Sequence, residues 1–255
     1  MGRAVASMTD DQQSADFGFR SVGVGEKAGL VREVFKSVAG RYDLMNDLMS
    51  LGIHRLWKSA LLDWLAPQPE TLLLDVAGGT GDIAVGYRTR GGGPVVVCDI
   101  NQAMIDTGRT RAAARGQTAG ISWLCGDAEA LPIPDHSIDA YTIAFGLRNV
   151  TKIDEALAEA RRVLRPGGRF LCLEFSRPAI GAIDPAYDFY SFKILPEIGH
   201  WVAGDRESYA YLVESIRRFP NQEALKKQMA VAGLERISHR DLSGGIAAIH
   251  SAWRL

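Results

Sequence analysis

Apolar residues recur at two different spacings along the chain, and the change of spacing divides it. Before residue 66 the spacing is helical in two segments, 30–38 and 56–65, and Pro67 ends the second. From residue 71 onward, short apolar runs alternate with further helical patterns. The apolar runs are 71–76, 95–100, 121–125, 138–146 and 169–175, and the helical patterns lie near 82–89, 102–114 and 152–164. This alternation predicts βαβ units and a mainly parallel sheet preceded by two helices.

The pattern changes again after residue 176. Residues 177–220 carry many aromatic side chains but no strand pattern, and a helix follows from Asn221 to near Gly233. The last two apolar runs, 234–242 and 245–255, are joined by a Ser-Gly-Gly turn and predict a closing antiparallel hairpin. Residues 1–25 are polar and Gly-rich and are expected to form a mobile tail. We therefore expect one domain over residues 26–255, with 177–220 as a helical insertion.

Composition narrows the class of protein. Apolar residues make up 47% of the 255 residues and charged residues 23%, with a net charge of -1, as in ordinary globular domains. This balance disfavours a nucleic-acid binder, and no apolar stretch is long enough to span a bilayer. The cysteines at 98, 125 and 172 lie in or beside apolar runs, which favours free thiols in a reducing, cytoplasmic compartment. No Cys or His cluster has metal-ligand spacing.

The segment LLLDVAGGTGDIA (72–84) carries the strongest chemical signal. A buried strand leads into glycines and then a helix, which lets the backbone approach a ligand closely. The next strand ends in Asp99, where a carboxylate accepts both hydroxyls of a ribose. The spacing Gly79-x-Gly81-x-x-Ala84 also fits a dinucleotide fingerprint, so a nicotinamide-dependent oxidoreductase is an open alternative.

Three features favour S-adenosylmethionine (SAM) as the nucleotide. Asp75 ends the first strand beside the glycine loop, where its carboxylate suits a cationic amino-acid end and repels a pyrophosphate. Asp127 and Ala128 follow the third strand, at a place suited to an adenine. Pro166-Gly167-Gly168 before the fifth strand is typical of methyltransferases.

Two longer signatures make the chain resemble a known family. YDLMNDLMSLGIHRLW (42–57) and RVLRPGGRFLCLEFS (162–176) are similar to the ubiquinone/menaquinone biosynthesis C-methyltransferases of the UbiE type, as are FGLRNV (145–150) and the closing hairpin. The likeness covers nearly the whole chain from about Phe17. The resemblance implies a doubly wound, mainly parallel seven-stranded sheet of the class I SAM-dependent methyltransferase type, with two N-terminal helices and a C-terminal antiparallel hairpin.

The resemblance also implies the reaction and the residues that bind the cofactor. The reaction is C-methylation of a polyprenyl quinol ring, with 2-polyprenyl-6-methoxy-1,4-benzoquinol, demethylmenaquinol or both as methyl acceptor. Thr80, Asp99, Asp127 and Ala128 would bind SAM, and the hydroxyl of Thr80 suits the methionine carboxylate. Gly79 and Gly81 of the glycine loop, and Asp75 at the end of the first strand, would complete the cofactor site.

Three residues are candidates for catalysis. Arg148 and Asn149 follow the fourth strand, where open α/β sheets bind their ligands. Arg148 would stabilise a phenolate or orient a water, unless it forms a salt bridge instead, with Asp154 as a partner. Asn149 would hold a ring oxygen. Tyr42, which opens the first signature, would cover the cofactor, touch the quinol or simply pack.

The substrate class sets the expected partners. A prenyl tail resides in lipid, so we expect peripheral contact with the inner face of a membrane, with residues 177–220 as the contact. A homodimer and contacts with other quinone-biosynthesis enzymes are also expected. A non-catalytic subunit that scaffolds such enzymes is the alternative, and the intact Asp99, Arg148 and Asn149 argue against it.

Overall fold

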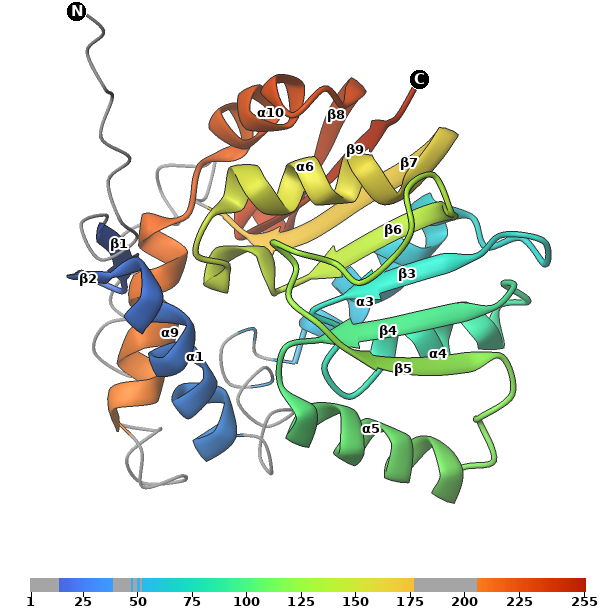
Figure 1. The fold of residues 1–255 in the computed structure, drawn as a ribbon, viewed down its shortest axis with the longest axis horizontal. Coiled ribbons are helices and arrows are strands. Elements are labelled where there is room, and N and C mark those ends of the chain that lie inside the picture. The colour runs from blue at the N-terminus through green and yellow to red at the C-terminus, as the bar shows by residue number, and fades with distance from the viewer. Residues whose placement is uncertain (1–13, 39–46, 48–49, 51, 177–205) are drawn as a thin grey trace, which may run out of the picture.

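The computed structural model describes residues 14–38, 47, 50, 52–176 and 206–255. The strands of its main sheet are β3 (Leu73–Val76), β4 (Val95–Asp99), β5 (Ile121–Cys125), β6 (Ile138–Ala144), β7 (Leu164–Phe175), β8 (Glu235–Leu242) and β9 (Ala247–Trp253). They lie in the order β5-β4-β3-β6-β7-β9-β8 (Figure 1). The first five are parallel, and β9 runs antiparallel to both β7 and β8. The expected fold class is confirmed.

Helices cover both faces of this sheet (Figure 1). The helices on the sheet are α3 (His54–Leu65), α4 (Asp82–Thr89), α5 (Gln102–Ala114), α6 (Ile153–Val163) and α10 (Gln222–Val231). Two more, α1 (Val24–Val38) and α9 (Arg206–Arg218), lie to one side of it, and η3 (Leu147–Asn149) and η5 (Ser243–Gly245) are short 3-10 turns. Within the described part of the chain, no helix is long and apolar enough to cross a bilayer.

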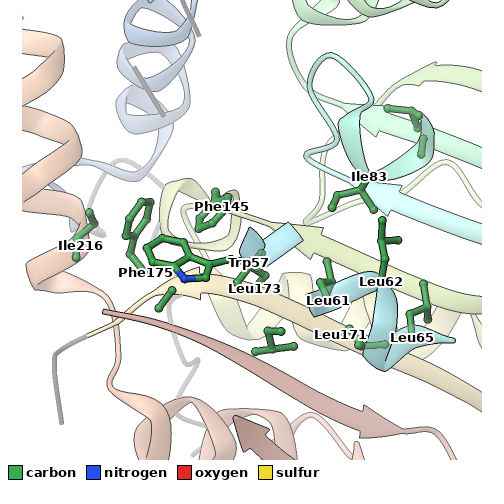
Figure 2. Packing of buried hydrophobic residues seen from close by; sticks show 14 of the residues in the cluster. Trp57, Leu61, Leu62, Leu65, Ile83, Phe145, Leu171, Leu173, Phe175 and Ile216 are labelled. Carbon is green, nitrogen blue, oxygen red and sulfur yellow. The ribbon is translucent and has the colours of Figure 1, made fainter. Parts of the chain in front are cut away.

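Alternate residues of the strands supply the two halves of the core. Leu73 packs in a cluster with α3 and α4, whereas its neighbour Leu74 packs in a second cluster with α6 and α10. Because successive side chains of a strand point to opposite faces, a strand covered on both sides is apolar throughout. Figure 2 shows the first cluster, in which Trp57 of α3 lies against Phe145 and Phe175.

The N-terminal segment differs from the expected tail. Residues 14–23 form a two-stranded hairpin of β1 (Ser14–Phe17) and β2 (Arg20–Gly23). Gly18 turns the chain with a φ of 58°, and Phe17 is buried. The hairpin, α1 and α9 lie together at one side of the molecule (Figure 1). Contacts with α9 hold this polar segment in place: Phe17 stacks on Tyr211, and the N–H of Phe19 donates to Glu214.

Candidate functional site

A pocket lies at the carboxyl ends of the parallel strands. Gly79 lines it after β3, Asp99 at the end of β4, Asp127 and Ala128 after β5, and Asn149 after β6. The carboxyl ends of parallel strands meet at one edge of the sheet, and ligands of open α/β sheets bind there. The topology therefore brings together five of the residues that the sequence singled out.

Two backbone donors hold the carboxylate of Asp99. Its Oδ2 accepts from the N–H of Gly79 at 2.9 Å, and its Oδ1 accepts from the N–H of Asn101 at 2.8 Å. Burial raises the pKa of Asp99, and these two hydrogen bonds act in the opposite direction. Each carboxylate oxygen keeps acceptor capacity, so the group is oriented and still able to bind two adjacent hydroxyls.

Other residues of the pocket lining suit a flat, apolar ring with a polar edge. Ala128 is buried, and Ile100 and Met104 line the same pocket. The Oδ1 of Asp127 accepts from the N–H of Glu129 at 3.0 Å, which fixes the turn that presents Asp127. This arrangement is compatible with the adenine expected there.

Asp75 and Thr80 line a second, smaller pocket beside the glycine loop, which Ala77 shares with the first. Asp75 is fully buried. Its Oδ1 accepts from the hydroxyl of Thr142 at 2.7 Å, whereas its Oδ2 has no partner. Burial raises the pKa of Asp75 to about 7. An unpaired buried carboxylate oxygen is costly unless a ligand supplies a donor, and an ammonium group would do so.

The glycines of the loop have different roles. Gly79 has a φ of 56° and donates to Asp99. Gly81 has a φ of 84°, and a Cβ there would lie 2.6 Å from the Trp123 ring. Gly81 lies outside the lining of either pocket and begins α4. The sequence predicts that Gly81 binds the cofactor. The close packing of α4 against the sheet is already a sufficient reason for a glycine at this position.

Arg148 lies in a different environment from the one expected. Its side chain is 1% exposed and it is not among the residues that line the pocket. Its Nη1 donates to Glu174 Oε1 at 2.6 Å and to the carbonyl of Phe145 at 2.7 Å. The partner is thus Glu174 of β7 and not Asp154. The guanidinium therefore pairs with a buried carboxylate, and a catalytic role for Arg148 stays a prediction.

Asn149 is the catalytic candidate that the structure does bring to the pocket. Its Oδ1 accepts from the hydroxyl of Tyr211, on α9, at 3.2 Å. Tyr211 belongs to the aromatic stretch 177–220, and its proximity to Asn149 depends on a tertiary contact between α9 and η3. The other candidate, Tyr42, lies outside the described residues.

The sequence did not predict two further charged residues, one in the pocket lining and one bonded to a lining residue. Glu129 lines it and accepts from the N–H groups of Thr151 and Lys152, at 2.8 and 3.0 Å. It thereby satisfies backbone donors ahead of α6, whose N-cap residue supplies no side-chain capping hydrogen bond. Lys27 of α1 is buried and donates to the carbonyl of Val150 at 2.9 Å. The sequence offered one signal, the position of Glu129 directly after Asp127 and Ala128.

Among the described residues, no group of three or more His, Cys, Asp or Glu has the arrangement of a metal site.

Comparison with known proteins gives consistent matches. The ubiE/COQ5 methyltransferase family matches residues 22–254. The chain is 59% identical to the ubiquinone/menaquinone biosynthesis C-methyltransferase UbiE of Acidiphilium cryptum, covering 95% of this chain and 98% of that protein. It is 50% identical to the mitochondrial 2-methoxy-6-polyprenyl-1,4-benzoquinol methylase of Rattus norvegicus, covering 98% and 88%. Among solved structures, a SAM-dependent methyltransferase from Thermotoga maritima matches with a TM-score of 0.64 at 19% identity, covering 88% and 100%.

Proposed function

The chain belongs to the ubiE/COQ5 methyltransferase family, and on that premise we propose that it transfers a methyl group from SAM to a ring carbon of a polyprenyl quinol. The main support is the pocket that Asp99 and Asn149 both line. Two backbone N–H groups orient the Asp99 carboxylate there, so that it could accept hydrogen bonds from a ribose. The names of the relatives support a benzoquinol or a naphthoquinol as acceptor.

The two adjoining pockets fit the parts of SAM. Asp99 would accept the ribose hydroxyls, and Asp127 and Ala128 would hold the adenine. The unpaired Oδ2 of Asp75 would accept from the ammonium of the methionine end, with the hydroxyl of Thr80 in the same small pocket. A pyrophosphate would instead meet the Asp75 carboxylate, which disfavours a dinucleotide.

SAM supplies a methyl group already activated as a sulfonium substituent. The acceptor carbon becomes nucleophilic when the neighbouring ring hydroxyl loses its proton. The protein's own work is then to hold the ring against the methyl and to favour the ionised oxygen. Asn149 would hold a ring oxygen with its side-chain amide, while Phe145, Val31 and Val150 give the same pocket an apolar lining.

Ligand binding separates this function from the oxidoreductase alternative. Calorimetric titration with S-adenosylhomocysteine and with NADH should give saturable binding of the former alone. Tight binding of NADH without a response to S-adenosylhomocysteine would reject the methyltransferase assignment.

We also propose that the protein works as one domain that docks reversibly on a membrane, and that this domain includes the hairpin of residues 14–23 ahead of the expected range 26–255. Residues 177–220 would cover the substrate; of these, 177–205 lie outside the described part of the chain. A homodimer and contacts with other quinone-biosynthesis enzymes stay predictions. Flotation with anionic vesicles that contain a long-chain quinol should carry the protein upward. Product formation on those vesicles by protein that stays wholly in the soluble fraction would contradict docking.

A further inference from the structure

Asn149 receives a hydrogen bond from an element far away in the sequence. The hydroxyl of Tyr211 donates to Asn149 Oδ1 at 3.2 Å, and both side chains lie where α9 contacts η3. An asparagine amide has two chemically different ends, and the network around it decides which end a ligand meets. With Oδ1 engaged by a donor, the amide keeps its two Nδ2 hydrogens for an acceptor.

The tyrosine is itself held in place. Its ring stacks on Phe17 of β1 with 4.2 Å between ring centroids and 18° between planes. Tyr211 is 4% exposed, so water does not compete for its hydroxyl. Burial raises the pKa of Tyr211, which keeps the hydroxyl protonated and a donor over the physiological range.

We propose that Tyr211 is a positioning residue that orients the Asn149 amide so that its N–H₂ end faces an oxygen of the methyl acceptor, with Phe17 fixing the tyrosine ring. The substrate part of this inference rests on the proposed function. A donor at that place favours the ionised form of a ring hydroxyl over the neutral one. The N-terminal hairpin, which lies outside the glycine-loop fold, thereby becomes part of the catalytic arrangement.

Tyr211→Phe removes the hydroxyl and preserves the aromatic stack. Single-turnover methyl transfer to a short-tailed quinol should slow about 3- to 10-fold, the range for one net hydrogen bond. Affinity for S-adenosylhomocysteine should stay within about twofold, since Tyr211 lines neither cofactor pocket. Tyr87→Phe is the matched control, because it removes a buried hydroxyl that donates to the carbonyl of Thr71 at 2.8 Å, outside both pockets. It should keep the wild-type rate.

A double-mutant cycle separates positioning from a general structural effect. In an Asn149→Ala background, Tyr211→Phe should have no further effect on the rate, because the group that it orients is gone. An equal loss in both backgrounds would overturn the proposal, as would an unchanged rate for Tyr211→Phe in the wild-type background.

A second readout does not depend on the substrate. In protein labelled with ¹⁵N-asparagine, the side-chain amide signals of Asn149, assigned by their absence in Asn149→Ala, should move in Tyr211→Phe and stay in place in Tyr87→Phe. Unmoved signals would overturn the orientation claim by themselves. If the signals move but the wild-type protein methylates no quinol, the orientation stands and the proposed function fails.

Discussion

Replacing Asp75 with asparagine should shift stability and cofactor affinity in opposite directions. Asp75 is fully buried, and burial raises its pKa from 3.8 to about 7. Between these values the folded state binds more protons than the unfolded state, so stability falls as the pH rises through about 7. Asparagine keeps the acceptor for the Thr142 hydroxyl but cannot ionise.

The magnitude follows from the two pKa values. Between pH 5 and pH 8, ionising Asp75 in the folded state removes about 3 kcal/mol of stability from the wild type and none from Asp75→Asn. The melting temperature of the wild type should therefore fall, relative to that of Asp75→Asn, by roughly 6 to 12 °C over this pH range for a chain of this size. Groups that titrate identically in both proteins cancel in this comparison.

Affinity should respond in the other direction. Losing a charged partner for the ammonium of the methionine end should weaken S-adenosylhomocysteine binding by about 10- to 150-fold, which corresponds to about 1.5–3 kcal/mol. In the wild type, binding should strengthen as the pH rises through about 7, because the ionised carboxylate is the form that pairs with the ligand.

The assay is thermal unfolding of both proteins at several pH values, with calorimetric titration of S-adenosylhomocysteine at each. Asp63→Asn is the control, because it removes an aspartate that is 70% exposed, and it should follow the wild type in both measurements. Parallel stability curves for the wild type and Asp75→Asn would refute the burial argument. Unchanged affinity in Asp75→Asn would remove Asp75 from the cofactor site.

Three further substitutions test other parts of the account. Asp99→Ala should cost about 1.5–3 kcal/mol of S-adenosylhomocysteine affinity in calorimetry, and full affinity in a folded variant would exclude Asp99 from the site. Arg148→Ala should cost about 3–5 kcal/mol of unfolding free energy in urea, because it leaves the carboxylate of Glu174 buried and uncompensated, and near-wild-type stability would contradict the buried ion pair. Gly81→Ala should cost about 1–3 kcal/mol through its positive φ and the crowding of Trp123, and a neutral effect in the same assay would argue against that packing role.

The sequence predicted the central sheet well, because its strands carry their own signal. The runs that became β3, β4 and β6 are short, mostly apolar and largely buried, whereas the edge strand β5 is only half-buried. Asp99 and Asp127 follow neighbouring parallel strands, and the carboxyl ends of parallel strands lie at the same edge of a sheet. The sequence could therefore predict that these two acids lie close together. Asn221 begins α10 as expected, and its side chain accepts from the N–H of Ala224 at 2.9 Å.

The misses share one physical cause, which is that the deciding contact comes from a distant part of the chain. Residues 14–23 are a hairpin that contacts with α9 hold in place, among them the stack of Phe17 on Tyr211. Glu129, from the turn after β5, accepts from the backbone N–H of Thr151 ahead of α6, a contact that the pattern around this helix does not predict. No local pattern distinguishes an arginine that faces a pocket from one that pairs with a carboxylate on the next strand.

Transfer of a labelled methyl group is the direct test of C-methylation by this protein. Purified protein is incubated with SAM that carries a ¹³C-labelled methyl group and a short-tailed quinol, and the products are analysed by mass spectrometry and carbon NMR. We expect one labelled methyl group on a ring carbon, formed by the wild type and strongly reduced in Asp99→Ala. A label on a ring oxygen, or no labelled quinol from folded protein that binds S-adenosylhomocysteine, would contradict it.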